Sequence, residues 1–180
     1  DKDDIRIEAN GTLDEVNAEI GIIRALLPAE HEWQSLLGKI QMEMMAVMSH
    51  VAIHRLFVIR IRTKYPMIWF LFVRTDRCFV GKMEDNGYFI LPGGSLVSAH
   101  LQLARTIVRR AERLSDVEPE RAGFTRIMQF VNRLSDLFFT MARYEMFCQG
   151  NAEERCSRFC ITEKAGQYLM MHKKGVFTFL

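Results

Sequence analysis

The stretch that decides the fold is residues 33–51, WQSLLGKIQMEMMAVMSHV, where apolar side chains recur at alternating spacings of four and three. Its apolar stripe consists of Trp33, Leu37, Ile40, Met44, Val47 and Val51. This spacing places the whole stripe on one face of an α-helix, and it is also the spacing of left-handed helix bundles. The stretch therefore predicts an amphipathic helix packed against other helices, with Met44, Met45 and Met48 filling the core.

Three further stripes of helical period lie on either side of this stretch. One precedes Pro28, which stops a helix, and two follow a connection rich in Gly and Pro at residues 84–95. In chain order they are Ile5, Ala9, Val16, Ile20, Ile23 and Leu27; Val97, Leu101, Ala104, Val108 and Ala111; and Ile127, Phe130, Leu134, Leu137, Met141 and Tyr144. Four amphipathic helices with short connections predict an all-α, antiparallel helical bundle.

The length and net charge of the chain limit the number of domains and the kinds of partner that we expect. The 180 residues suit one compact domain, which we place at residues 1–150. Residues 151–180 have little periodicity and form a tail to which we assign no role. Lys and Arg number 24 against 22 for Asp and Glu, so the net charge of +2 gives no reason to expect a nucleic-acid or acidic-membrane partner.

Cysteine spacing and hydropathy argue against several other classes. The cysteines are Cys78, Cys148, Cys156 and Cys160. They form no C-x-x-C pair and have no histidine at zinc-ligand spacing, so we expect reduced thiols and no structural metal. The N-terminus, DKDDIRIEAN, lacks the apolar core of a signal peptide, and the apolar run at residues 67–73 is far shorter than the ~20 residues of a membrane span. We expect a cytoplasmic protein without a membrane partner.

Charged side chains gather on the polar face of the third predicted helix. In ARTIVRRAER, residues 104–113, Arg105, Arg109 and Glu112 fall at offsets of four and seven, so they project from one face. Two guanidinium groups one turn apart can each bind phosphate oxygens through paired N–H donors, and a nearby carboxylate can hold them in place or meet a metal. The same pattern also fits a solvated, salt-bridged helix surface.

Other polar and aromatic candidates lie elsewhere in the chain. Asn132 on the last predicted helix could bind an amide or a ribose, or could face water. Asp14 and Glu15 on the first helix could pair with one of the arginines. Phe89 in YFILPGG stands beside a flexible glycine pair, where its ring could meet a flat ligand or tuck under the bundle.

Three blocks of the sequence carry a resemblance to a known family. RIEANGTLDEVNAEIG (residues 6–21), FILPGGSLVSAHLQLARTIVRRAER (residues 89–113) and FVNRLSDLFFTMARYEM (residues 130–146) closely resemble the PduO-type ATP:cob(I)alamin adenosyltransferases. The blocks occur in the family's order and cover about a third of the chain. The resemblance implies a five-helix, ferritin-like up-and-down bundle that forms a homotrimer, with ATP and the corrinoid bound between neighbouring subunits.

The resemblance also implies a reaction and a nucleotide site. Such enzymes transfer the 5′-deoxyadenosyl group of ATP, used with Mg²⁺, to cob(I)alamin, giving adenosylcobalamin and triphosphate. By matched motifs, Arg105 would act near ATP as a catalytic residue together with Asp14, its ion-pair partner from a neighbouring subunit. Arg109 would hold phosphates, and Glu112 and Asn132 would line the nucleotide site.

On the corrinoid side, the matched residue is Phe89. It would press on the lower face of the corrinoid and displace the axial base, so that cobalt is reduced more easily. Gln102 stands where a histidine is common in the LHxAR motif of the family. No general base is implied, because the reaction depends on electrostatic positioning and on a hydrophobic wedge.

Three segments depart from the family pattern. Family members begin with a Thr- and Gly-rich segment of the type TKTGDxGxT that cradles the ATP phosphates, and in its absence we expect weak ATP binding. Residues 54–79 are basic and aromatic where the family has Asn, Pro and acidic residues. This segment and residues 114–126 both match the family better when read out of frame. Compensated frameshifts are our hypothesis, and a divergent insertion forming a β-hairpin is the alternative.

Two other functions stay open at this point. One is a non-catalytic corrinoid-binding or carrier protein of the same fold, which would keep Phe89 and the subunit interface but not ATP chemistry. The other is a helical interaction module without a small ligand. Binding of cobalamin without turnover of ATP would favour the first of these, and absence of both would favour the second.

Overall fold

The computed structural model describes residues 5–52, 79, 81, 83, 89–115 and 124–156. Within these ranges the chain forms four α-helices: α1 (Ile5–Leu26), α2 (Trp33–Ala52), α4 (Leu96–Ser115) and α5 (Phe124–Cys148). The all-α class is confirmed for this part of the chain, and the count of five helices stays a prediction. None of the described helices is long and apolar enough to cross a membrane.

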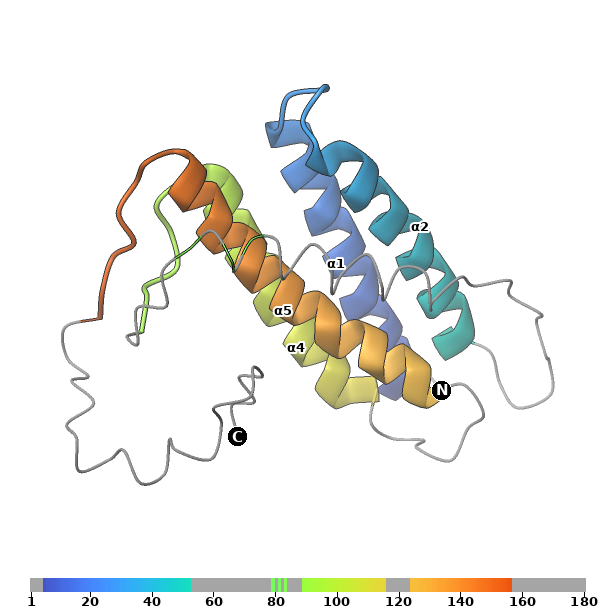
Figure 1. Ribbon diagram of the computed structural model, residues 1–180. Helices are drawn as coiled ribbons and strands as arrows, with labels where there is room; N and C mark the ends of the chain where they lie inside the picture. Colours follow the sequence, from blue (N-terminus) through green and yellow to red (C-terminus); the bar gives the residue numbers. More distant parts are fainter. Residues whose placement is uncertain are drawn as a thin grey trace, which may run out of the picture.

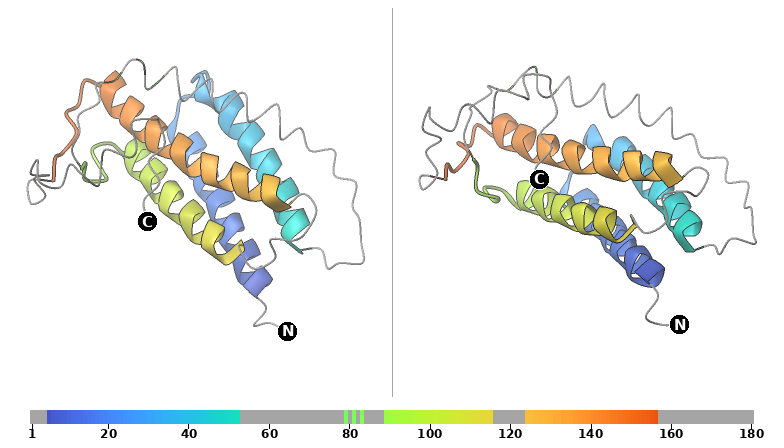
Figure 2. Two further views of the ribbon diagram at one scale, coloured as in Figure 1. Left: turned by 60° about the horizontal axis from the view of Figure 1, so that its bottom comes forward. Right: turned by 90° about the horizontal axis from the view of Figure 1, so that it is seen from below.

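The helices pack side by side in the order α2, α1, α4, α5 (Figure 1). Neighbouring helices run in opposite directions, and Figure 2 shows the same pairing of α4 with α5 from two other sides. The antiparallel bundle that the four stripes predict is therefore present. Because α1 lies between α2 and α4, it has two buried sides.

The predicted stripes form the hydrophobic core. Every stripe residue whose side chain is described is buried. Leu13 is buried as well: it lies four positions after Ala9 and three before Val16, on the same helix face, so the prediction omitted a member of the stripe. The prediction that Met45 fills the core was wrong, since it is 53% exposed and lies one position beyond the buried Met44. One position along a helix turns a side chain by about 100°, which takes Met45 off the stripe.

Polar contacts between helices set their register. Between α1 and α2, the Arg24 Nη1 donates to Gln41 Oε1 (2.7 Å), and Gln41 Nε2 donates to the backbone oxygen of Asn17 (3.0 Å). Between α1 and α4, His100 Nδ1 lies 2.5 Å from Glu19 Oε1, whose side chain is largely buried. Hydrogen bonds at fixed positions favour one alignment of helices that apolar contact alone would leave loosely defined.

Helix α5 ends in a Schellman turn that reverses the chain. The Gly150 N–H donates to the carbonyl of Phe147 (3.1 Å) and the Asn151 N–H donates to that of Met146 (3.0 Å), while Gly150 has a φ of 67°. The turn directs residues 151–156, here called the strap, to the segment that precedes α4 (Figure 1). The sequence pattern assigned no role to these residues, so their packing against the bundle is a finding of the structure.

The close approach of Gly94 to Met146 gives a stability prediction. Gly94 has a φ of +90°, and a Cβ there would lie 2.2 Å from Met146 Cε. We expect Gly94→Ala to lower the free energy of unfolding by about 1–3 kcal/mol, chiefly through backbone strain, with a smaller cost for moving the flexible end of buried Met146. In the control Gly93→Ala the φ is also positive (+145°) but nothing lies within 4 Å, so the loss should be smaller. Equal losses in urea denaturation would contradict the packing argument.

A buried carboxylate oxygen on α2 gives a pH-dependent prediction. Glu43 Oε2 is buried without a hydrogen-bond partner among the described residues, and burial raises the pKa of Glu43 above its ordinary value of 4.5. The folded chain therefore holds this proton more tightly than the unfolded chain, so the group destabilises the fold as the pH rises above 4.5. We expect Glu43→Gln to raise the urea midpoint at neutral pH and to change it little in acid. If Glu43→Gln raised the urea midpoint equally in acid, burial of the charged carboxylate would not be the cause.

The two segments suspected of frameshift lie mostly outside the described residues. Residues 54–78 and 116–123 are not among them, so the frameshift hypothesis stays a prediction. At the end of the first segment, Phe79 is buried and its ring stacks on that of Tyr144, with the centroids 4.2 Å apart. At least this residue of the anomalous stretch contributes to the core.

Candidate functional site

Four of the predicted site residues lie on the neighbouring helices α4 and α5. Arg105, Arg109 and Glu112 follow one another at one-turn intervals on α4, and Asn132 lies on α5. All four side chains are partly buried, so they are neither core residues nor freely solvated ones. Partial burial strengthens charge interactions relative to an open surface, and it is the usual setting of a ligand site.

Glu112 and Asn132 are brought together by the packing of α4 on α5. Asn132 Nδ2 donates to Glu112 Oε1 at 2.8 Å, and Asn132 Oδ1 accepts from Arg133 Nη2 at 2.6 Å. Arg133 is held in turn by Asp136, with 2.8 Å between Nη1 and Oδ2. This series of contacts fixes the orientation of the Asn132 amide, so the directions of its N–H donors and of its oxygen acceptor are set. A side chain oriented in this way suits the recognition of a polar ligand edge.

Arg105 is held in place by uncharged partners. Its Nε donates to Gln102 Oε1 at 2.8 Å, and its guanidinium lies 5.9 Å from the ring centroid of Phe139. Burial, followed by the positive charge of Arg109, lowers the pKa of Arg105 below its ordinary value. An anion placed between the two guanidinium groups would relieve both the desolvation and the repulsion.

Arg109 makes no hydrogen bond or ion pair with any residue in the described part of the chain. Its neighbour Arg110, on the same turn, is instead exposed and ion-paired with Glu15 of α1. The two adjacent arginines therefore differ in role. Arg110 links α4 to α1 through its ion pair, whereas the N–H donors of Arg109 have no partner among the described residues. The expectation that Asp14 or Glu15 would pair with Arg105 or Arg109 is not met within the single chain.

Asp14 is exposed on α1 and forms no ion pair with a described residue. The proposed partner of Asp14, Arg105 of a neighbouring subunit, would lie on another copy of the chain. This pair therefore stays a prediction.

Phe89 precedes α4 and is held through its backbone by the strap. The Cys156 N–H donates to the Phe89 carbonyl (2.9 Å), and the Leu91 N–H donates to the Glu154 carbonyl (2.8 Å), on either side of an antiparallel bridge between Ile90 and Arg155. The Phe89 side chain is 43% exposed. The exposed part of this ring can meet a flat ligand while the backbone holds the residue in place.

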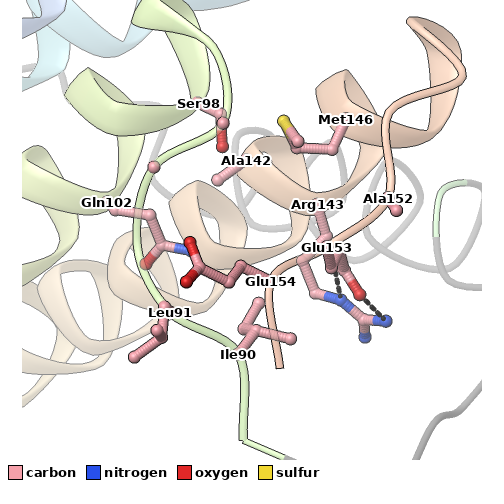
Figure 3. A pocket seen from close by; sticks show the side chains of 12 residues that line it. Ile90, Leu91, Ser98, Gln102, Ala142, Arg143, Met146, Ala152, Glu153 and Glu154 are labelled. Carbon is pink, nitrogen blue, oxygen red and sulfur yellow. Dashed lines mark hydrogen bonds and ion pairs between the residues drawn. The ribbon is translucent and has the colours of Figure 1, made fainter. Parts of the chain in front are cut away.

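A pocket lies between this segment, the start of α4 and the end of α5 (Figure 3). Buried Ser98 and Gln102 face it from α4, and the Arg143–Glu153 ion pair crosses from α5 to the strap. The hydrogen bond from Arg105 to Gln102 connects this pocket to the arginine face of α4. Sequence reasoning did not assign a site role to Gln102 or Glu153, and no periodicity marks either residue.

Comparison with known proteins places the chain in a family. A family model for cobalamin adenosyltransferase matches residues 1–145. The corrinoid adenosyltransferase of Bacillus subtilis is 36% identical over 152 residues, which cover 79% of this chain and 75% of that protein. The human corrinoid adenosyltransferase MMAB is 34% identical over 161 residues, covering 85% of this chain and 64% of the human protein.

Solved structures agree with the sequence comparison. A phenylalanine-to-alanine variant of a PduO-type ATP:corrinoid adenosyltransferase from Lactobacillus reuteri, complexed with cobalamin and ATP, has a TM-score of 0.76 and 27% identity to this chain. The match covers 87% of this chain and 88% of that one. The helical bundle, the α4 motif and these relatives together define the class, and the chain belongs to the cobalamin adenosyltransferase family.

Proposed function

We propose that this chain catalyses transfer of the 5′-deoxyadenosyl group of ATP to cob(I)alamin. The observation that carries the proposal is the pair of partly buried guanidinium groups of Arg105 and Arg109, neither of which has a carboxylate partner among the described residues. In a member of this family, the natural ligand for such a pair is the triphosphate of ATP. The solved relative complexed with cobalamin and ATP supports the same pair of substrates.

The reaction is a nucleophilic substitution at the 5′ carbon of ATP. The electron pair of Co(I) forms the Co–C bond, the C5′–O bond breaks, and its electrons leave with triphosphate, so cobalt is formally oxidised from +1 to +3. The nucleophile carries no proton, and no general base is needed. The protein's contribution is to bind and align the two substrates and to stabilise the charge of the leaving group.

The described side chains divide into nucleotide and corrinoid groups. Arg109 would bind the phosphates through its available donors, and Arg105 would lie beside the bond that breaks. The Glu112–Asn132 pair would contact the nucleoside, since its amide and carboxylate are oriented by the 2.8 Å bond between them. Phe89 would press its exposed ring on the lower face of the corrinoid and displace the axial base.

Mg²⁺ would enter the site with the triphosphate. Protein sites for Mg²⁺ in nucleotide enzymes use one or two carboxylates together with substrate phosphates. The described residues contain no group of three or more His, Cys, Asp or Glu that would hold a metal by itself. Among the described residues, Glu112 is a carboxylate on the same helix face as the two arginines that could reach such an ion.

We further propose a homotrimer in which Asp14 of one subunit pairs with Arg105 of the next. The exposure of Asp14 and the lack of a carboxylate beside Arg105 within the described part of one chain support this pairing. Light scattering after gel filtration tests the trimer. A monomer that retains full activity would overturn both the assembly and the catalytic role of Asp14.

The proposed function is tested by following absorbance during ATP-dependent conversion of chemically reduced cob(I)alamin to adenosylcobalamin. The assay is run on this chain and on one with a TKTGDxGxT-type N-terminal segment added. Turnover in either supports the enzyme. Binding of cobalamin without turnover in both would favour the non-catalytic carrier, and absence of binding would overturn the corrinoid site.

A further inference from the structure

The pairing between the strap and the Phe89 segment is short. Leu91 donates to the Glu154 carbonyl at 2.8 Å and Cys156 donates to the Phe89 carbonyl at 2.9 Å, around one bridge between Ile90 and Arg155. A two-stranded pairing of this length is marginal by itself, because it has no sheet to extend it. Its persistence requires an anchor for the strap outside the pairing.

One such anchor is an ion pair between Glu153 and Arg143. Arg143 Nε lies 2.7 Å from Glu153 Oε1, and Arg143 Nη2 lies 3.1 Å from Glu153 Oε2, so the contact is a two-pronged fork (Figure 3). The Arg143 and Glu153 side chains are only 19% and 14% exposed. Paired, charge-assisted bonds with little exposure to solvent fix both distance and orientation.

Arg143 is itself placed on a rigid part of the bundle. It lies on α5, and its guanidinium is 6.0 Å from the ring centroid of Phe139, the same ring that Arg105 approaches at 5.9 Å. The ion pair therefore attaches the strap to the helix whose aromatic side chain also contacts the predicted ATP arginine. Glu153 is only one residue from Glu154, whose carbonyl holds Leu91.

We propose that Glu153 is a positioning residue for Phe89. The Glu153–Arg143 pair fixes the strap, and the strap fixes the backbone of Phe89 and, with it, the point from which the ring meets the corrinoid. The inference rests on the proposed corrinoid role of Phe89.

Two variants of Glu153 test this positioning. Glu153→Gln keeps the shape and removes the charge, and Glu153→Ala removes the fork altogether. The matched control is Glu154→Gln, which removes one charge at the next position while leaving the backbone carbonyl that holds Leu91. Circular dichroism and thermal unfolding show whether each variant retains the helical bundle.

Hydrogen exchange gives the first readout. We expect the Leu91 and Cys156 amides to exchange about tenfold faster or more in Glu153→Ala, because loss of the anchor opens the pairing locally. The Ala99 amide, which lies in the first turn of α4 and donates to the carbonyl of Ser95, the residue that precedes the helix, should not change. Unchanged exchange at Leu91 and Cys156 would overturn the anchoring role of the ion pair.

Corrinoid binding and kinetics give the second readout. A residue that only stabilised the fold would not change these corrinoid parameters selectively. With ATP present, the four-coordinate cob(II)alamin absorbance should fall and the KM for cob(I)alamin should rise about fivefold or more, with the KM for ATP within about twofold. A loosened strap with normal corrinoid kinetics would overturn the positioning role. If the unmodified chain already lacks turnover and the four-coordinate signal, the proposed function fails instead, so the two failures are distinguishable.

Discussion

Replacing Arg109 by alanine is expected to raise the dissociation constant for ATP about 10- to 100-fold, because hydrogen bonds to a charged group contribute about 1.5–3 kcal/mol. The affinity for cob(II)alamin should stay within about threefold, since the change removes a phosphate partner only. Arg109 is a suitable target because its side chain has no hydrogen-bond or ion-pair partner among the described residues, so its removal breaks no such bond between them.

The control for this experiment is the next residue. Arg110→Ala removes the same charge from the same helical turn, but its guanidinium pairs with Glu15 and stands outside the proposed site. Calorimetric titration with ATP and absorbance titration with cob(II)alamin measure the two affinities separately. Arg109→Lys should fall between wild type and alanine, since lysine keeps the charge and loses the planar fork. Equal loss of both ligands in Arg109→Ala would remove it from the phosphate site.

The fold was predictable because the core depends on a repeated local signal. A buried residue on a bundle helix recurs every three or four positions, so the stripe is visible without knowledge of the partner helix. Glu19 and Met45 mark the limits of this reasoning. How wide a buried face is depends on how many neighbours a helix has, and α1, which has two, also buries most of the Glu19 side chain against His100 of α4.

The site was predictable only where its residues share one helix. The spacing of Arg105, Arg109 and Glu112 is local and can be read directly, and the family resemblance adds Asn132 and Phe89. The 2.8 Å bond between Glu112 and Asn132 requires the register of α4 on α5, which periodicity does not give.

The contacts of the strap could not be predicted from the sequence for a related reason. The Arg143–Glu153 pair joins a helix to the chain beyond its end, across a Schellman turn at Gly150. No fixed sequence spacing connects such partners. The predicted pair of Asp14 with Arg105 involves a second copy of the chain, so neither the sequence pattern nor one folded chain contains it.

Replacing Phe89 by alanine is expected to remove the four-coordinate cob(II)alamin signal while leaving the dissociation constant for ATP within about twofold. The expectation follows from where the ring lies: it is 43% exposed, it precedes α4, and it lies outside the Arg105–Arg109 face. An alanine keeps the backbone carbonyl that accepts from Cys156, so the pairing with the strap should persist. What is lost is the apolar ring itself.

Two further variants decide whether the ring or general apolarity matters. Phe89→Leu keeps an apolar side chain without a flat face, and it should recover less than half of the signal if the ring must lie against the corrinoid. Leu96→Ala removes another exposed apolar side chain near the start of α4 and should leave the signal intact. An unchanged spectrum in Phe89→Ala would exclude Phe89 from the corrinoid site. Because ATP binding is measured on the same samples, that result would leave the nucleotide assignments standing and would show that axial-base displacement depends on another part of the chain.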